Sequence, residues 1–306
     1  MTILRTLCLA LFGLLCLCTT AKAVEVPKVT LVLSDDTPLY QNFAASLKLD
    51  LRERLQMDVL HRVEDFSSTA AAPDLIVTVG LKAANWVAPR TQTPMLATLI
   101  PQSQYAELSR QRPKGTVTSA IFLNQPIERQ IDLLHTALPE SKKVGLLHSP
   151  EIKLDIDEVR SVLARHGMTL ISRSSSSPDT LHKDLEFVLD RSDVLLVIPD
   201  NGIYSSNTIR NILLQSYRQD VPLVGYSQAL VKSGALCAVY SSPEQIATQT
   251  SVMVSQFFKN ETLPIPQHPQ FFSIAVNSDV AKSMGISIPS AESLKNRIAK
   301  LQGGRR

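Results

Sequence analysis

Residues 74–80 read Asp74-Leu75-Ile76-Val77-Thr78-Val79-Gly80, and this stretch indicates the class of fold. Between its first and last residues the segment is apolar on both alternating faces, apart from Thr78. That composition is typical of a parallel strand that is covered by helices on each side. A similar segment, Asp193-Val194-Leu195-Leu196-Val197-Ile198, lies in the second half of the chain. Together they predict an α/β protein.

Strand and helix patterns alternate on both sides of these segments. Phe43, Leu47 and Leu51, for example, recur at helical spacing within residues 40–55. The first half predicts strands at 29–34, 57–63, 74–80, 94–100 and 118–123, and helices at 40–55, 81–88, 102–110 and 127–137. The pattern then restarts with strands at 143–148, 168–172, 193–198, 221–225, 236–240 and 271–276, and helices at 154–165, 180–189, 207–218, 228–232 and 244–258.

This repetition predicts two doubly wound parallel-sheet lobes joined by a hinge. Ligands of open α/β sheets bind beyond the carboxyl ends of the strands. Two lobes that face each other across those ends would form a cleft, and a hinge would allow the cleft to close.

The C-terminal run from Phe271 to Pro289 reads as a strand, a short helix, a glycine stop and a last apolar segment that suggests another strand. Asn277 or Ser278 can cap the helix, and Gly285 can end it in the left-handed conformation. As a string of residues, this run resembles the tail of ABC transporter substrate-binding proteins of the tryptophan/tyrosine-binding type. Softer matches in the same order cover residues 74–84, 130–147, 193–201, 222–236 and 263–266.

The resemblance implies the type I periplasmic binding protein fold, in which the chain crosses between the lobes three times. The crossings would fall near 123–125, 240–243 and 262–267. Lobe 1 would then comprise residues 27–122 plus 243–262, and lobe 2 residues 125–240 plus 266–290. Residues 291–306 are expected to form a C-terminal tail.

Residues 1–23 have the parts of a secretory signal peptide. Arg5 precedes an apolar run at 7–18, and Ala21-Lys22-Ala23 forms a small-x-small cleavage site. The run is too short to span a membrane, which takes about 20 residues. Cys16 and Cys18 each follow Leu rather than a small residue, which disfavours a lipoprotein. We therefore expect a periplasmic protein that begins at about residue 24.

The mature chain would keep Cys237 alone, so neither an internal disulfide nor a cysteine metal site is expected. Its formal charge falls from +3 to about +1 as Arg5 and Lys22 leave, and no basic stripe indicates nucleic acid. Catalytic motifs and phosphate-binding loops are missing from the sequence, so we expect neither an enzyme nor a cofactor. The acidic run 155–158 fits the first turn of a helix, with an acidic metal site as the alternative.

Polar residues follow the predicted strands of both lobes, where a ligand would bind. Each could instead be a helix cap or a loop residue, but the shared edge favours a site. The candidate ligand contacts are Ser34, Asp35, Asp36, Gly80, Leu81, Thr98, Ser149, Asp200, Asn201, Tyr226, Ser227 and Tyr240. Asp200 would bind an ammonium group, while Ser34 and the helix start at Gly80 would bind a carboxylate.

The chain departs from the family pattern mostly at these loops. Leu81 replaces a usual Thr, and Tyr240-Ser241 replaces a usual Asp-Tyr pair. The first hypothesis is the solute-binding component of an ABC importer, with an inner-membrane permease as partner and a small polar or amphipathic, amino-acid-like ligand. The altered loops favour the alternative, a periplasmic sensory or protein-interaction module without transport.

Overall fold

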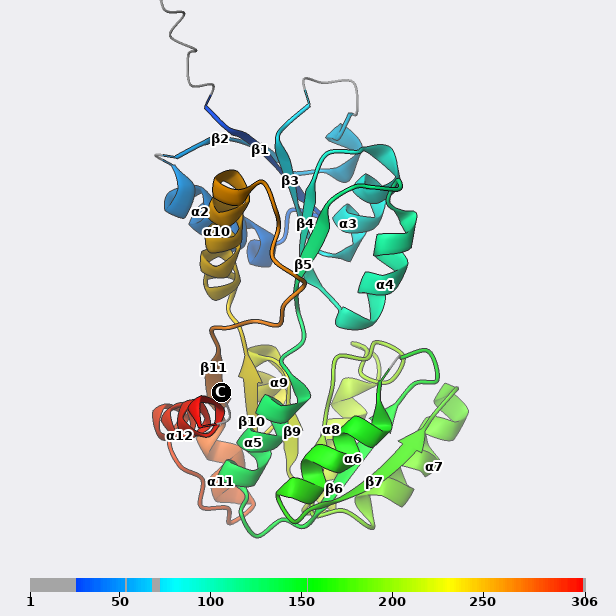
Figure 1. Ribbon diagram of the computed structural model, residues 1–306. Coiled ribbons are helices and arrows are strands. Elements are labelled where there is room, and N and C mark those ends of the chain that lie inside the picture. The colour runs from blue at the N-terminus through cyan, green and yellow to red at the C-terminus, as the bar shows by residue number, and fades with distance from the viewer. Residues whose placement is uncertain (1–25, 53, 68–71, 153, 305–306) are drawn as a thin grey trace, which may run out of the picture.

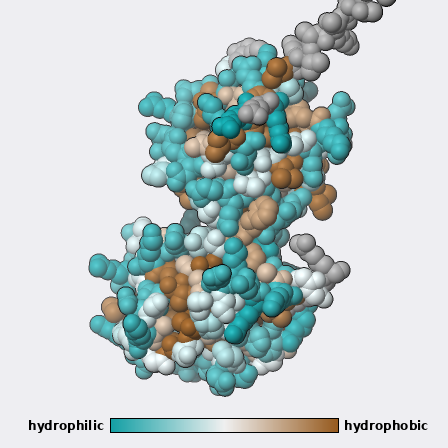
Figure 2. Space-filling view, turned by 90° about the vertical axis from the view of Figure 1, so that its left-hand side faces the viewer, coloured by the Kyte–Doolittle hydropathy of each residue, from teal (hydrophilic) through white to brown (hydrophobic). Residues whose placement is uncertain are grey.

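The computed structural model describes residues 26–52, 54–67, 72–152 and 154–304, so the predicted signal peptide and the two terminal arginines lie outside the described residues. The chain forms two α/β lobes, one above the other in Figure 1, as the sequence predicted. Figure 2 shows them as two bodies joined by a narrower waist. No helix among the described residues is long and apolar enough to cross a membrane.

Lobe 1 is built on a five-stranded parallel sheet in the order β2-β1-β3-β4-β5. Its strands are β1 (Lys28–Leu33), β2 (Gln56–Leu60), β3 (Leu75–Val79), β4 (Met95–Ile100) and β5 (Thr118–Phe122). Helices α2 (Pro38–Leu51) and α10 (Pro243–Asn260) cover one face, while α3 (Leu81–Val87) and α4 (Gln102–Gln111) cover the other (Figure 1). Short 3-10 turns occupy Val63–Asp65 and Ala88–Arg90.

Alternate residues of the buried strands supply these two faces. Leu31 and Val77 pack with Phe43 of α2, whereas Val32 and Ile76 belong to the cluster on the α3 side. Successive side chains of a strand point to opposite faces, so a strand between two helical layers must be apolar throughout. This explains why residues 75–79 are entirely buried.

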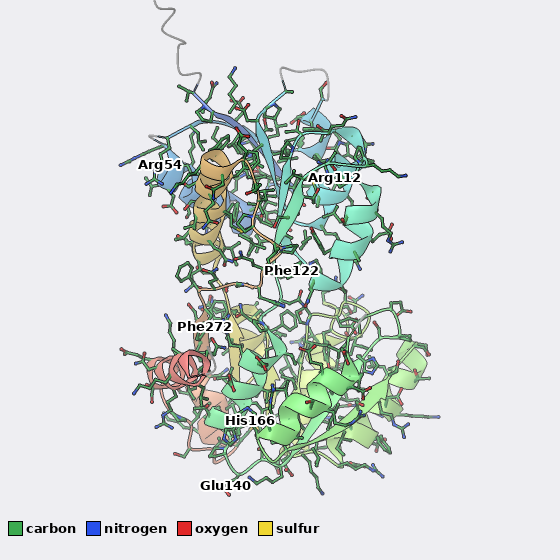
Figure 3. The ribbon with its side chains drawn as sticks, in the orientation of Figure 1. Arg54, Arg112, Phe122, Glu140, His166 and Phe272 are labelled. Atoms are coloured by element: carbon green, nitrogen blue, oxygen red, sulfur yellow. The ribbon has the colours of Figure 1, made fainter. Side chains whose placement is uncertain are left out.

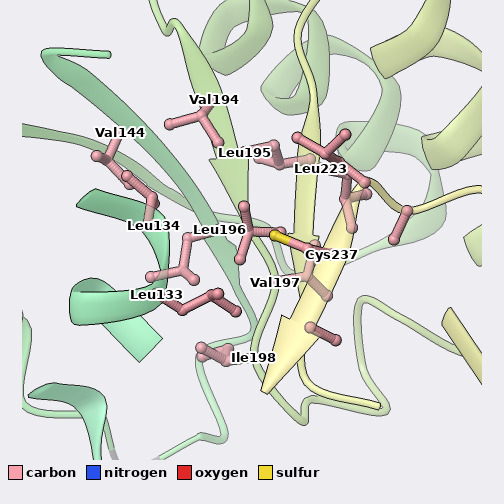
Figure 4. Close-up of a cluster of buried hydrophobic side chains, with 14 of the residues drawn as sticks. Leu133, Leu134, Val144, Val194, Leu195, Leu196, Val197, Ile198, Leu223 and Cys237 are labelled. Atoms are coloured by element: carbon pink, nitrogen blue, oxygen red, sulfur yellow. The ribbon is translucent and has the colours of Figure 1, made fainter. Parts of the chain in front are cut away.

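Lobe 2 is built on a six-stranded sheet in the order β11-β10-β9-β8-β6-β7. Its strands are β6 (Lys143–His148), β7 (Thr169–Ser174), β8 (Val194–Leu196), β9 (Leu223–Gly225), β10 (Cys237–Tyr240) and β11 (Ser273–Val276). Its helices are α5 (Ile127–Ala137), α6 (Ile156–Arg165), α7 (Pro178–Leu189), α8 (Ile209–Arg218), α9 (Gln228–Ser233), α11 (Ser278–Ser283) and α12 (Ala291–Gly303). Figure 4 shows part of its core, where Leu133 of α5 and Leu196 of β8 lie near Cys237.

Several details differ from the sequence expectations. Strand β11 pairs antiparallel with β10, so the second sheet is not wholly parallel. The predicted final strand at 286–288 does not form, although Asn277 does cap α11 and Gly285 has a positive φ of 66°. Residues 291–303, expected to be a tail, form α12 instead. Its Leu294 and Ile298 are fully buried in the lobe 2 core, since apolar residues at helical spacing bury one face of a helix.

The third crossing comes later in the chain than 262–267. Gln267 still pairs with β5 of lobe 1: its N–H donates to Ala120 O at 2.8 Å, and its carbonyl accepts Phe122 N–H at 2.9 Å. An expected start of lobe 2 at residue 266 is therefore too early. In Figure 3 the labelled Phe122 lies on the lobe 1 side of the waist and Phe272 lies on the lobe 2 side.

The carboxyl ends of the parallel strands in each lobe face the other lobe. Strand β5 runs directly into the crossing toward lobe 2, and β1, β3 and β4 run parallel to it. Strand β10 likewise runs into the crossing back to lobe 1, parallel to β9, β8 and β6. The loops after these strands therefore line the space between the lobes.

Candidate ligand-binding cleft

The edge of lobe 1 that faces lobe 2 is closely packed around Gly80. Ser34 is buried, and its hydroxyl donates to Val79 O at 2.8 Å while it accepts Ala83 N–H at 2.9 Å. Gly80 has a φ of 87°, and a Cβ there would lie 2.5 Å from Ser34 Oγ and 2.6 Å from the Tyr40 hydroxyl oxygen. Only glycine fits this position. The Ser34 hydroxyl is thus occupied by contacts within the lobe.

Tyr40, which the sequence did not single out, shares this edge. Burial raises the pKa of its phenol, and the negative charge of Asp35 raises it further, while a hydrogen bond with Ser34 lowers it. The phenol therefore stays protonated and can donate a hydrogen bond at neutral pH.

The other candidate ligand contacts of lobe 1 range from exposed to fully buried. Asp35 is exposed and accepts Thr37 N–H at 3.0 Å, and the exposed Asp36 contacts Gln41. Leu81 is half-buried at the start of α3. Thr98 is fully buried and donates to Thr78 O at 2.9 Å, so its hydroxyl points into the sheet rather than toward the other lobe.

The facing edge of lobe 2 is organised by Asp200. Its Oδ2 accepts Ser149 N–H at 2.6 Å, and its Oδ1 accepts the Ser149 hydroxyl at 2.9 Å and Gly202 N–H at 3.0 Å. Tyr226 lies nearby, and burial together with the Asp200 charge raises its pKa. The structure thus brings together three sequence candidates, Ser149, Asp200 and Tyr226.

The remaining lobe 2 candidates lie around this group. Asn201 is exposed, and Ser227 caps α9 by accepting Leu230 N–H at 3.2 Å. Tyr240 is half-buried at the end of β10, where burial raises its pKa. Asp155 accepts the N–H groups of Asp157 and Glu158 and so caps α6, and the acidic run lies at the start of this helix, as predicted.

A cavity of about 490 Å³ opens between the lobes, within the range typical of small-molecule sites. Lobe 1 contributes the start of α4, and lobe 2 contributes the start of α5, the loops after β6 and β8 and the start of α6. The first and third crossings complete the lining. The lining residues are Gln102, Ser103, Ala106, Asn124, Gln125, Pro126, Ile127, Glu128, Gln130, Ile152, Leu154, Asp155, Glu158, Ile198, Pro199 and His268.

None of the twelve candidate contacts is among these lining residues, although Pro199 directly precedes Asp200. The lining residues come mainly from the start of α4, the loop after β5 and the starts of α5 and α6, where no candidate contact was placed. Gln102 and Asn124 lie two residues after β4 and β5, so the same strand-end rule, applied to these two loops, would have found them. His268 was missed because it reaches the cavity from the third crossing, which only the folded chain brings there.

The three crossings meet in one hydrogen-bond network beside the cavity. Arg129 is 6% exposed, and its Nη1 donates to Gln125 Oε1 and to Pro269 O, both at 2.7 Å. Its guanidinium lies 4.5 Å from the centre of the Phe272 ring. Gln125 Nε2 in turn donates to Ser241 Oγ at 2.8 Å. The first, second and third crossings are therefore connected through Arg129 and Gln125.

Known proteins resemble this chain at low identity. A tyrosine-binding protein of Clostridioides difficile (strain R20291) is 21% identical over 194 residues, which cover 61% of this chain and 55% of the relative, so the match spans about half of that protein's length. A domain from Streptococcus pneumonia in complex with L-Trp has a TM-score of 0.63 at 20% identity and covers 89% of this chain and 98% of that one. A ligand-free, open substrate binding protein with adhesive properties from Clostridium difficile has a TM-score of 0.68 at 18% identity, covering 87% and 97%. These structures show the shared fold.

A family model described as ABC transporter substrate binding protein matches residues 58–298 of this chain. Proteins of this family are the ligand-binding components of transporters and are not enzymes, and they are typically extracellular or periplasmic. The chain belongs to the ABC transporter substrate-binding protein family.

Proposed function

We propose that the chain is the periplasmic solute-binding component of an ABC import system. It binds a small polar or amphipathic, amino-acid-like ligand between its lobes by hinge closure and delivers the ligand to an inner-membrane permease. The observation that carries this proposal is the 490 Å³ cavity, because both lobes and the first crossing line it. A ligand that contacts both lobes stabilises the closed arrangement of the hinge.

The relatives support the ligand class. One is named a tyrosine-binding protein and another is a complex with L-Trp, so amino-acid-like molecules are the first to test. The signal-peptide pattern at 1–23 supports export to the periplasm. The twelve candidate contacts remain part of the proposal, and so do the lobe boundaries, except for the start of the last lobe 2 segment and the C-terminal tail, which the structure corrects.

Thermal unfolding of residues 24–306 with a panel of amino acids, short peptides and nucleosides tests solute binding. A ligand at 100 times its Kd adds about 2.7 kcal/mol to the free energy of unfolding. For a chain of this size, that gain raises the midpoint by several degrees. A shift that saturates with ligand concentration would support the proposal.

A pair of variants tests whether the solute binds in the cavity. Ala106→Trp places a large ring on the cavity wall formed by α4, and binding should fall at least tenfold. Ser109→Trp is the matched control, since Ser109 is exposed on the same helix and does not line the cavity. If no solute shifts the midpoint, the alternative of a sensory or protein-interaction module without transport gains support.

A further inference from the structure

Gln130 of α5 carries an unused hydrogen-bond acceptor at the cavity. Gln130 lines the cavity and is 4% exposed, and its Nε2 donates to Gln125 O at 3.1 Å. Because a backbone carbonyl only accepts, the amide must present its nitrogen to Gln125 and its Oε1 away from it. Oε1 has no partner among the described residues. A buried acceptor left unpaired is unfavourable, so this site favours a ligand that donates a hydrogen bond.

His268 adds a second acceptor to the cavity wall. Its Nδ1 lies 2.9 Å from Asn124 O, and this nitrogen must carry the proton because the carbonyl cannot donate. In the neutral ring the other nitrogen, Nε2, is then an acceptor. Gln130 lies on α5, after the first crossing, and His268 lies in the third crossing, so only the folded chain brings the two side chains to one cavity.

Formal charge at the cavity is negative. Glu128, Asp155 and Glu158 are lining residues, while no Lys or Arg lines the cavity in the described part of the chain. Glu128 is paired with Arg165. Asp155 and Glu158 have no ion pair with a basic side chain among the described residues, which do not include Lys153. The starts of α4, α5 and α6 carry partial positive charge of about half an elementary charge each. That charge offsets part of the negative charge of the described acids.

Other lining residues are apolar. Ile152, Leu154 and Ile198 contribute aliphatic side chains from lobe 2, on the same side of the cavity as the acids of α6. A ligand that lies against them would have an apolar body beside its charged group. The α4 start is the natural place for a carboxylate, but its first amide, Gln102 N–H, already donates to Asn124 Oδ1 at 2.9 Å.

We propose that the solute is a cationic amine with an apolar body, and that Gln130, His268 and the α6 acids Asp155 and Glu158 bind its ammonium group. This inference rests on the proposed function and narrows its ligand class. An amine is preferred over the corresponding amino acid because the described cavity wall offers acceptors and negative charge but no cationic side chain for a carboxylate.

Titration calorimetry with matched pairs tests the preference. The pairs are tryptamine with tryptophan and tyramine with tyrosine, which differ only in the carboxylate, and indole-3-acetate supplies the anion without the ammonium group. We expect each amine to bind at least tenfold more tightly than its amino acid, and the anion to bind most weakly. Equal or tighter binding of the amino acids would overturn the inference while leaving the proposed function intact.

Variants of two exposed glutamates test whether the negative charge at the cavity contributes to amine binding. Glu158→Gln should weaken amine binding about threefold to tenfold, because it removes one negative charge at the cavity without changing the shape of the side chain. Glu140→Gln is the control, since Glu140 is exposed at the far end of lobe 2 (Figure 3) and should leave affinity unchanged. Equal effects of the two substitutions would contradict the assignment.

The two proposals fail in different ways. Binding of a neutral or anionic solute from the wider panel, with none of the amines bound, would refute the amine and keep solute binding. Absence of binding across both the matched pairs and the wider panel would refute both.

Discussion

The carboxylate of Asp200 holds Ser149 by two hydrogen bonds, one to its backbone N–H at 2.6 Å and one to its hydroxyl at 2.9 Å. These bonds join the loop after β8 to the end of β6 at the edge that faces lobe 1. Asp200 is 5% exposed, so water does little to weaken them. The carboxylate therefore stabilises the lobe 2 edge whether or not it also meets a ligand.

Asp200→Asn should lower the free energy of unfolding by about 1–3 kcal/mol. The NH₂ group of the Asn side chain would then face a donor, such as the N–H of Ser149 or Gly202, that the carboxylate of Asp200 now accepts. Ser149→Ala removes only the hydroxyl bond and should lower it by about 1 kcal/mol. Urea unfolding of the two variants measures both values. An Asn variant as stable as the native chain would show that the carboxylate charge is unimportant here.

Gly80→Ala should be more destabilising than Gly115→Ala. Both glycines have positive φ, 87° and 81°, which other residues rarely adopt, so both substitutions carry backbone strain of about 1–3 kcal/mol. At Gly80 the added Cβ also meets Ser34 and Tyr40, whereas at Gly115 nothing lies within 4 Å. Denaturant midpoints that fall equally in the two variants would mean that the close approach at Gly80 relaxes freely.

Arg129→Met should lower the free energy of unfolding by about 3 kcal/mol, since it leaves Gln125 Oε1 and the Pro269 carbonyl without their buried donor. Arg191→Met is a suitable control. Arg191 also lies over an aromatic ring, that of Phe187, but it is exposed, and its replacement should change stability by no more than about 0.5 kcal/mol. Similar losses in both variants would argue against the hydrogen-bond network of Arg129 and Gln125 as a source of stability.

Stability should fall above pH 10, and Tyr204 should account for part of the fall. Burial raises the pKa of its phenol far above the ordinary value, and the charges of Asp200 and Tyr226 raise it further. The unfolded phenol ionises from about pH 10 while the folded one stays protonated, so alkali favours unfolding. Below pH 10 this group causes no pH dependence.

The Tyr204→Phe variant separates the effect of Tyr204 ionisation on stability from the effects of other groups that ionise in alkali. At neutral pH the variant should be less stable by about 1 kcal/mol, through loss of the bond to Leu147 O. At pH 11 the native protein should lose about 1.4 kcal/mol that the variant does not lose, so the difference should vanish or reverse. Parallel pH profiles from urea titrations between pH 8 and 11 would contradict a buried, protonated Tyr204.

Local sequence patterns predicted most elements of the fold because each depends on nearby residues. The buried run 75–79 required two covered faces, and neighbouring residues predicted both the cap at Asn277 and a helix start at the acidic run 155–158. Local patterns did not predict the secondary structure of residues 286–303. Ile286 to Ile288 is apolar like a strand but forms no ladder, while α12 is fixed by burial of Leu294 and Ile298 against distant parts of lobe 2.

The sequence by itself determined two α/β lobes, the alternation of their elements and the edge at which each lobe presents polar residues, since periodicity and strand direction are local properties. Only the tertiary structure decided which of those residues line the cavity. Gln130 and His268 are 138 positions apart in the sequence and meet at one cavity wall because the third crossing returns along β5 before it enters lobe 2. That return depends on long-range backbone pairing between Gln267 and Ile121, for which no local pattern exists.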